Sequence, residues 1–344
     1  MSCLRATSST DLSCTVVTTE APSTVPATPP GASGGLRVGF LGPWGTFTEQ
    51  ALRTQPDLAA AELVPLATMA DVLVAAESGA VDLGFVAIEN SIEGGVNITS
   101  DTLAFDVDVL IQREVVIGVQ QHLMGVPGAT VAGLVEVVSI PHATAQARTF
   151  LRRALPSVRT RAVNSTSEGA RLVAELADPT VGAIGNELAA EIYGLEVLAR
   201  DIEDHPENQT RFVAVRPNVV PPPTGHDKTS VVVAQRADRP GSLLAILQEF
   251  AARSINLTKL ESRPTKKALG EYCFLLDMEG HVADDVVADC LKALRMKHGS
   301  VKFLGSYPSA DTHGPAVRRD VDEAGREADD WLGAIRALIG PDPA

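Results

Sequence analysis

Several features that would place this protein in a class at once are scarce or missing. Its 344 residues include only four cysteines, Cys3, Cys14, Cys273 and Cys290, with no metal-binding or redox spacing. Such sparse use of cysteine predicts reduced thiols in a cytoplasmic protein. No apolar run approaches the roughly 18 residues of a membrane-spanning helix, so no membrane span is expected.

Positive charge is in short supply. The sequence has 29 basic and 43 acidic residues, a formal net charge of -14 at pH 7. Like charges repel, which argues against a nucleic acid or an anionic membrane as partner. An anionic small molecule remains compatible, because the local field of a pocket can oppose the net charge.

Familiar catalytic signatures are also missing. The sequence has no nucleophile elbow in Ser-His-Asp order, no metal triad, no P-loop and no GxGxxG. For His142, at a predicted helix start, and His205, in a polar stretch, a solvated surface role is favoured over catalysis. The remaining candidates are hydroxyls, amides and one arginine. They predict a reaction without cofactor or metal, driven by the chemistry of its substrate.

The first 35 residues are rich in Ser, Thr, Pro and Ala and show no apolar period. This composition predicts a disordered N-terminal tail. The tail lacks the apolar core of a secretory signal. A transit peptide is the less favoured alternative, because Arg5 is the only basic residue before Arg37.

Residues 36–215 alternate short apolar runs with helical patterns, which predicts an α/β fold with parallel sheets covered by helices on both faces. Thr46 is a suitable N-cap, and Glu49 would complete a capping box. A division near residue 112 suggests two lobes with a cleft between them. Strands are expected at 36–41, 81–88, 115–119, 135–140, near 163 and at 181–184, and helices after Thr46 and at 69–78, 143–155, 167–176 and 187–193.

A second domain follows a proline-rich stretch. Residues 216–228 contain three consecutive prolines and predict a stiff, extended linker. Residues 229–307 then show the order strand, helix, strand, strand, helix, strand, which predicts a ferredoxin-like βαββαβ domain. Residues 308–344 predict a polar tail with one amphipathic helix that packs on a neighbouring surface, and a frayed tail is the alternative. The apolar face of this helix holds Trp331, Leu332, Ile335 and Leu338.

The segment at 208–212 (NQTRF) is the most informative one in the chain. It opens an apolar run just before the linker. If that run is a strand, Thr210 and Phe212 face one side and Arg211 the other. The end of a strand is where α/β proteins bind ligands, although an arginine at a strand edge is the simpler interpretation of this segment alone.

A second polar cluster follows the predicted strand at 81–88. In residues 87–95 (AIENSIEGG), Gly94 and Gly95 let the backbone approach a ligand and offer amide donors to an anion. A surface loop that caps the next helix is the alternative. Thr46 and Thr166 stand at comparable junctions between strand and helix. Together these residues predict helix N-termini that converge on one cleft and bind carboxylates.

These stretches, taken together, resemble the signature regions of the prephenate dehydratase family over about residues 37–215. Two later stretches resemble the effector motifs of the ACT regulatory domain. The resemblance implies a two-lobed, periplasmic-binding-protein-like catalytic domain followed by an ACT domain. The matching stretches are 42–47 (GPWGTF), 89–91 (ENS) with Gly94, 208–212, 241–244 (GSLL) and 261–264 (ESRP).

The resemblance implies the decarboxylative dehydration of prephenate to phenylpyruvate in phenylalanine biosynthesis. By resemblance, Thr210 assists the departure of the ring hydroxyl, Arg211 holds a carboxylate and Phe212 packs beneath it. Further substrate contacts are expected from Asn90, Ser91, Thr46 and Thr166.

The match is not complete. The family often shows His-Pro-Gln-Ala-Leu-Ala-Gln, whereas residues 140–146 read IPHATAQ, with Ile140 in place of the histidine. No role of that histidine carries over, and His142 does not replace it. Ser167 stands where the family often has alanine.

The ACT resemblance implies that paired domains bind L-phenylalanine as a feedback inhibitor, in a homo-oligomer (dimer or tetramer) that shifts between two states. The short distance from Thr210 to the linker suggests that the sensor acts through that joint. The effector-binding residues implied are Gly241, Ser242, Leu243, Leu244, Asn256, Leu257, Glu261, Ser262, Arg263 and Pro264.

Other interpretations stay open. Arogenate dehydratase is a close alternative, and a non-catalytic amino-acid-binding module is one from another class. Thr210 argues against prephenate decarboxylase, a relative that keeps the hydroxyl.

Overall fold

The computed structural model describes residues 35–235, 240–266, 271–310 and 330–338. The N-terminal tail expected at 1–35 falls almost wholly outside these ranges, as does most of the tail expected after residue 308. In the second tail, residues 330–336 are helical, and the side chains of Trp331, Ile335 and Leu338 are exposed.

The first lobe is built on a sheet in the strand order β2-β1-β3-β11-β5. Strands β2 (Glu62–Leu66), β1 (Arg37–Leu41) and β3 (Leu83–Asn90) are parallel. Strand β11 (Gln209–Arg216) lies antiparallel to both β3 and β5 (Leu110–Gly118). A two-residue strand, β4 (Gly94–Gly95), pairs with the end of β3.

Helices cover both faces of this sheet. Apolar side chains of α1 (Phe47–Arg53) and α2 (Pro56–Ala59) pack with Phe40 and Phe85 on one face. Those of α3 (Met69–Ser78) and α4 (Asn97–Phe105) pack on the other.

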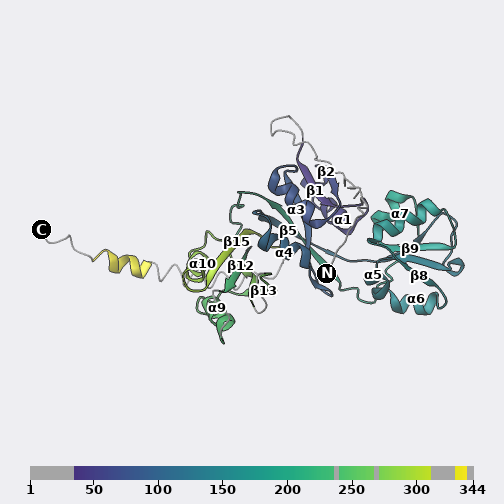
Figure 1. The fold of residues 1–344 in the computed structure, drawn as a ribbon. Coiled ribbons are helices and arrows are strands. Elements are labelled where there is room, and N and C mark those ends of the chain that lie inside the picture. The colour runs from purple at the N-terminus through teal and green to yellow at the C-terminus, as the bar shows by residue number, and fades with distance from the viewer. Residues whose placement is uncertain (1–34, 236–239, 267–270, 311–329, 339–344) are drawn as a thin grey trace, which may run out of the picture. The chain divides into compact units, whose positions relative to one another are not determined.

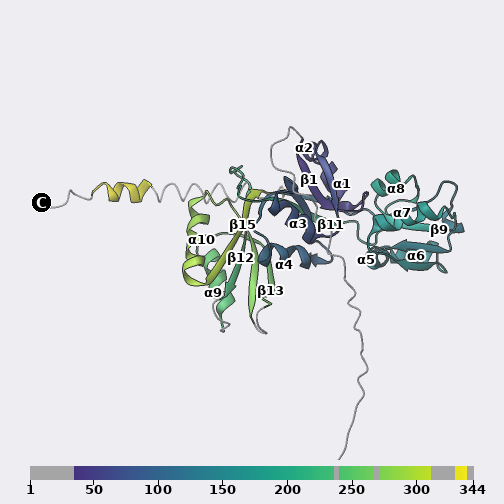
Figure 2. The ribbon, with the colours of Figure 1, turned by 45° about the horizontal axis from the view of Figure 1, so that its top comes forward.

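The second lobe has its own sheet, in the order β10-β6-β9-β7-β8. Its helices α5 and α6 lie on one face and α7 and α8 on the other (Figures 1 and 2). The strands are β6 (His122–Gly125), β7 (Glu136–Ser139), β8 (Arg159–Ala162), β9 (Val181–Gly185) and β10 (Glu196–Ala199), with a 3-10 turn at Val131–Gly133. The helices are α5 (Pro141–Gln146), α6 (Arg148–Ala154), α7 (Thr166–Leu176) and α8 (Glu187–Tyr193).

Both sheets are mixed, whereas the alternation of elements predicted parallel sheets. The chain leaves the first lobe after β5 and returns as β11, so the lobes divide near residues 118 and 208 rather than near 112. The returning strand β11 is antiparallel to its neighbours, and β6 is antiparallel to β9 and β10. The predicted fold class, a two-lobed α/β domain, is confirmed.

The C-terminal domain has the strand order β13-β14-β12-β15, with helices α9 and α10 on the same side of the strands (Figure 2). This is the βαββαβ arrangement expected from the sequence. Its other sheet face contributes Val232, Leu275 and Leu304 to the apolar core that contains α3 and α4. The elements are β12 (Asp227–Gln235), α9 (Ser242–Ala251), β13 (Leu257–Pro264), β14 (Tyr272–Glu279), α10 (Asp285–Lys297) and β15 (Gly299–Pro308).

Local signals set several helix ends as expected. The Thr46 hydroxyl accepts the N–H of Glu49 at 3.2 Å and starts α1. The Glu49 carboxylate reaches back to the N–H of Gly45 rather than that of Thr46, at 2.6 Å. The helix predicted at 143–155 is two helices, because the backbone at Ala147 (φ -104°, ψ 16°) departs from helical values.

Cys273 and Cys290 are buried and unbonded, which fits reduced thiols. Cys3 and Cys14 lie outside the described residues. Within the described ranges, no helix combines the length and the apolar character needed to cross a membrane.

Candidate active site

Two neighbouring strands bring the polar segments of the first lobe together. Strand β3 ends in Asn90, and β11 begins beside it, with Thr210 paired opposite Asn90. Ser91 follows directly, and its N–H donates to the carbonyl of Gln209 at 2.9 Å. The segments at 89–95 and 208–212 therefore form one site, although more than 100 residues separate them in sequence.

The side-chain amide of Asn90 is held in one orientation. Its Oδ1 accepts the backbone N–H groups of Ile92 and Glu93, both at 3.0 Å. Its Nδ2 must then point the other way, and it donates to Thr210 Oγ1 at 2.9 Å and to Asn208 Oδ1 at 2.9 Å.

Asn208 links this site to the second lobe. It is buried, and its Nδ2 donates to the Gln146 side chain on α5 at 3.3 Å. Gln146 in turn donates to Glu93 Oε1 at 3.4 Å. Asn208 was part of the segment singled out in the sequence, but its role as a connector depends on contacts between distant residues that no local pattern reveals.

The hydroxyls predicted to bind substrate differ in how their protons are used. Thr46 Oγ1 donates to the carbonyl of Leu41 at 3.2 Å while it caps α1. Ser91 Oγ donates to Asn208 Oδ1 at 3.3 Å and accepts from the N–H of Gln209 at 2.9 Å. Thr210 Oγ1 only accepts, from Asn90, among its bonds in the described part of the chain. Its proton is therefore available to another molecule.

The loop before α1 contacts the second lobe. Gly45, in a left-handed conformation (φ 84°), packs so closely on Ala189 of α8 that a Cβ would lie 3.0 Å from its Cα. The Tyr193 hydroxyl donates to the carbonyl of Trp44 at 2.9 Å. Thr46 therefore lies in a junction between the lobes as well as at a helix start.

On the second lobe, polar groups gather where β9 ends and α7 begins. Thr166 is the first residue of α7, and Ser165 rather than Thr166 caps it, accepting the N–H of Glu168 at 2.9 Å. Ser167 Oγ and Asn186 Nδ2 are buried, and neither has a hydrogen-bond partner within the described ranges. Asn186 was not predicted, because its cap position, shown by Oδ1 accepting the N–H of Ala189, looks purely structural in the sequence.

The structure does not support the expectation that Arg211 holds a substrate carboxylate. Its side chain is only 11% exposed. All three of its nitrogens are bonded within the protein: Nε to Glu114 at 2.6 Å, Nη1 to Asp277 at 2.6 Å and Nη2 to the Tyr307 hydroxyl at 2.8 Å. The side chain points to the opposite side of β11 from Thr210, as alternation along a strand requires.

Charges in this buried group stabilise one another. Burial raises the pKa of Asp277, but the Arg211 guanidinium and the Ser230 hydroxyl outweigh it and hold that pKa below its ordinary range. The same balance, with Arg211 and Lys228 opposing burial, lowers the pKa of Glu114. Burial raises the pKa of the Tyr307 hydroxyl far above its usual value, so it stays neutral.

The remaining candidates are placed as follows. Phe212 is buried and stacks on Phe85, with ring centroids 5.5 Å apart, so it supports the site from the core. His142 is exposed, and its Nδ1 lies 3.2 Å from Glu93 Oε2. His205 is also exposed, beside Glu207 at 3.2 Å.

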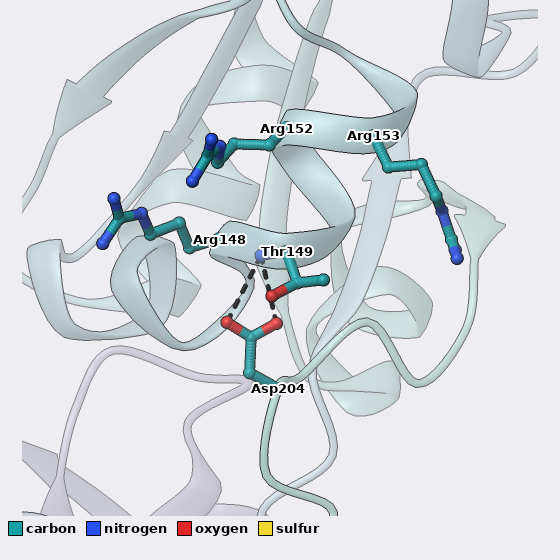
Figure 3. Close-up of a pocket in the computed structure, with 5 residues that line it drawn as sticks. All are labelled: Arg148, Thr149, Arg152, Arg153 and Asp204. Carbon is teal, nitrogen blue, oxygen red and sulfur yellow. Dashed lines mark hydrogen bonds between the residues drawn. The ribbon is translucent and has the colours of Figure 1, made fainter.

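A separate hollow of about 580 Å³ lies against α6. Figure 3 shows Arg148, Arg152 and Arg153 spreading away from the helix, while Asp204 accepts the N–H of Thr149 at 3.1 and 3.3 Å. None of these arginines has an ion-pair partner in the part of the chain that the structure describes.

Comparison with known proteins decides the family. A family model described as prephenate dehydratase matches residues 38–219, and one described as ACT domain matches residues 229–295. A prephenate dehydratase from Amycolatopsis methanolica is 42% identical over an alignment of 310 residues that covers 87% of this chain and 98% of that protein. The chain belongs to the prephenate dehydratase family. This confirms the enzyme predicted from the sequence and its ACT domain.

Solved structures agree with this assignment. The prephenate dehydratase from Arthrobacter aurescens in complex with L-Phe is 39% identical, with a TM-score of 0.81, over 88% of this chain and 100% of that one. A structure described as GqqA, a quorum-quenching acylase, is 29% identical with a TM-score of 0.72, over 80% of this chain and 98% of that one. The fold is therefore shared with a protein described by another activity.

The ACT domain contains a pocket at the first predicted effector motif. A hollow of about 410 Å³ is lined by Gly241, Ser242, Leu243 and Leu244, together with Gln235, Leu247, Tyr272 and Phe274. The register of β13 on β14 places Ser262 and Pro264 opposite Phe274 and Tyr272, on the same sheet face as that pocket.

Other predicted effector residues lie elsewhere in the chain. Glu261 and Arg263 face the first lobe, where Arg263 bonds Asp101 at 2.8 Å and Asn97 at 2.6 Å on α4. Asn256 and Leu257 stand at the far end of β13, where Asn256 donates to Glu279 at 2.9 Å. A single chain therefore does not bring the predicted effector residues together.

Proposed function

We infer that Thr210 assists the departing oxygen in the conversion of prephenate to phenylpyruvate. In this reaction the ring carbon loses its carboxylate as carbon dioxide. The electron pair of that bond moves into the ring, and the hydroxyl leaves from the opposite carbon. The leaving oxygen takes up a proton and becomes water. Proton donation, or a hydrogen bond that strengthens as the oxygen gains charge, lowers the barrier.

The observation that carries this assignment is the Asn90 amide. Because Asn90 Nδ2 donates to Thr210 Oγ1 at 2.9 Å, and backbone N–H groups fix the orientation of Asn90, the Thr210 proton is directed away from Asn90 and has no acceptor among the described residues. A threonine is a weak acid, but aromatisation supplies the driving force. Assistance on the order of 10²- to 10⁴-fold is typical of a positioned donor.

We place the carboxylates of the substrate nearer to α7 than to Arg211. The start of an eleven-residue helix favours negative charge. Thr166 lies there with Ser167, whose buried hydroxyl has no bond within the described residues. In this proposal Asn90, Ser91 and Thr46 hold the site in shape, and Phe212 supports it from below.

A matched pair of threonine variants tests the role of Thr210. Thr210→Ala should lower kcat by about 10²- to 10⁴-fold, and Thr210→Ser should retain part of the activity because it keeps the hydroxyl. Thr180→Ala removes a hydroxyl whose one hydrogen bond within the described ranges goes to Asp178, and this variant should behave as wild type. Phenylpyruvate formation, read by its absorbance in alkali, gives the rate. A fully active Thr210→Ala protein would contradict the assignment.

Substrate choice within the family is tested in the same assay. Prephenate and arogenate differ only where a keto group is replaced by an amine, and both should be offered to the wild-type protein. The chain is 42% identical to a prephenate dehydratase and 29% identical to the acylase GqqA. We therefore propose prephenate as the substrate.

We propose L-phenylalanine as the effector of the ACT domain. The pocket beside α9 is of a size to take an amino acid and carries the apolar side chains of Leu243, Leu247 and Phe274. Two of its lining residues, Leu244 and Tyr272, are exposed, 59% and 46% respectively, and Leu260 on β13 is 48% exposed. A second copy of the domain would bury this apolar rim and supply the effector residues that one chain leaves apart. The protein would then be a dimer or a larger homo-oligomer.

Calorimetric titration tests this site. L-phenylalanine should bind the wild-type protein and inhibit it, and Leu244→Asp should weaken both effects by placing a charge at the pocket. Met296→Asp, on an exposed position of α10 in the same domain, serves as the control and should bind normally. An absence of heat with wild-type protein would refute the proposed effector.

A cytoplasmic location, predicted from the sparse use of cysteine, stays a prediction.

A further inference from the structure

A buried cluster of charges joins the strand that carries Thr210 to the ACT domain. Arg211 directly follows Thr210, and its guanidinium bonds Asp277 of β14 and the Tyr307 hydroxyl of β15. Asp277 is itself buried, and its second oxygen accepts the Ser230 hydroxyl at 2.6 Å. Ser230 also lies 2.6 Å from Tyr307. Strands β12, β14 and β15 of the ACT sheet therefore meet around the side chain of one residue from β11.

The ladder of the catalytic sheet is irregular at this point. Arg211 pairs with Glu89, whereas Phe212 pairs with Ala87, so Ile88 is an extra residue on β3. Such a bulge interrupts the ladder and turns the side chains beside it. The bulge interrupts the pairing of β11 with β3 next to Thr210, while β11 keeps a regular register with β5 there. The side chain of Arg211 is therefore one of the anchors that set the direction of the Thr210 hydroxyl.

A second contact reaches the same place. Glu261 of β13 packs on Gly95, where an added Cβ would lie 2.6 Å from Glu261 Oε2. Gly95 pairs with Glu89, directly before Asn90. Lys259, also on β13, lies 3.8 Å from Glu89 and 3.3 Å from Glu261. The ACT sheet thus touches both strands whose ends form the active site.

We propose that Asp277 of the ACT domain is a positioning residue for Thr210, which it holds in place through Arg211. The carboxylate fixes the guanidinium, the guanidinium fixes the β11 backbone beside the bulge, and the backbone sets the aim of the Thr210 hydroxyl toward the leaving oxygen. Asp277 touches no substrate. The inference rests on the proposed role of Thr210.

The same arrangement gives the effector a route to the active site. Tyr272 and Phe274 line the proposed effector pocket on the strand that also carries Asp277. A shift of β14 on one sheet face moves Asp277 on the other. Residues 217–226, between β11 and β12, are not needed for this route, in contrast to the coupling through the linker suggested by the sequence.

The test compares two substitutions in the ACT domain at matched loss of stability. Asp277→Asn removes the charge that holds Arg211, and Leu294→Ala opens the core beneath α10, away from the first lobe. With prephenate as substrate, Asp277→Asn should lower kcat about 10- to 100-fold with little change in KM, the cost of a misplaced group. Leu294→Ala should lower the Tm but leave kcat unchanged.

Milder variants keep the test decisive if Asp277→Asn does not fold. Ser230→Ala removes the hydroxyl that orients Asp277 and should lower kcat in the same direction, by a smaller factor. Two glycines inserted between Pro222 and Pro223 should leave kcat and inhibition by L-phenylalanine unchanged.

Several results would overturn the proposal. A folded Asp277→Asn protein with wild-type kcat, a Ser230→Ala protein with wild-type kcat, or an equal loss of kcat in Leu294→Ala would each do so. If lengthening the linker abolished inhibition by L-phenylalanine, the effector signal would pass through the linker and not through Asp277. If wild-type protein did not turn over prephenate, the proposed function would fail instead, and the two failures are thus distinguishable.

Discussion

Arg211 and the three arginines of α6 differ in burial, in pairing and in access to solvent. Arg211 is buried, and all of its nitrogens are bonded to groups of the protein. Arg148, Arg152 and Arg153 spread from α6 around an open hollow and have no ion pairs within the described ranges (Figure 3). A buried charge must be paired because desolvation is costly, whereas an exposed one is satisfied by water.

The comparison shows that an arginine beside a catalytic residue need not bind the substrate. In a chain with a net charge of -14, an unpaired positive charge favours the binding of an anionic substrate. The Arg211 guanidinium, next to Thr210, nevertheless forms ion pairs with Glu114 and Asp277. The buried ion pairs of Arg211 should affect the stability of the fold and its pH dependence, whereas the exposed arginines of α6 should affect only the capture of substrate. Each effect is measured separately.

The largest effect is expected from removing the buried charge. Arg211→Gln would leave Asp277 and Glu114 without their main counter-charge, which costs about 3–5 kcal/mol when a buried pair is broken. Urea unfolding should show this loss, and kcat should fall with it. Arg152→Gln is the matched control, and its midpoint should not move. Equal midpoints for all three proteins would mean that Arg211 is not buried as described.

A smaller effect is expected from pH. The folded-state pKa values of Asp277 and Glu114 lie below their ordinary values, so the unfolded chain binds protons more readily. The stabilisation is therefore complete above a pH of about 5 and is lost as the pH falls through the folded-state values.

Thermal melts between pH 7 and pH 3 measure this effect. The Tm of wild type should fall on acidification more steeply than that of a variant with both Asp277→Asn and Glu114→Gln. Added salt should change the difference little, because buried pairs are poorly screened. Parallel curves for the two proteins would contradict this origin of the acid sensitivity.

The smallest effect is expected at α6. A variant with Arg152→Gln and Arg153→Gln should lose only a few-fold in kcat/KM for the dianionic substrate at low salt, through weaker electrostatic attraction, and nothing at high salt. Initial rates at two ionic strengths are sufficient. A loss of kcat/KM that persists at high salt would mean that these arginines contact the substrate directly, which would contradict the contrast drawn with Arg211.

The sequence predicted local features well. The helix predicted at 69–78 is confirmed with both ends, and in the structure Thr68 caps it and Gly79 ends it in a left-handed conformation. The capping role of Thr46 and the order of elements in the ACT domain were predicted for the same kind of reason. These features depend on residues a few positions apart.

Long-range features were predicted poorly. In the first lobe α2, β2 and α4 were missed, and in the second lobe β6 and β10. The mixed sheets depend on where a returning strand enters, which no local pattern encodes. The partner of Arg211, Asp277, lies 66 residues away in another domain. Strand alternation did predict that Arg211 faces away from Thr210, and only the resemblance to the family suggested a substrate contact.

A double-mutant cycle between Arg211→Gln and Asp277→Asn tests the central claim most directly. It uses kcat and KM for prephenate, at a temperature where all four proteins are folded. If Arg211 acts through Asp277, both single variants lower kcat with similar KM, and the double variant is no worse than either. If Arg211 instead holds a substrate carboxylate, Arg211→Gln raises KM and Asp277→Asn does not. The effects of the two substitutions then add in the double variant.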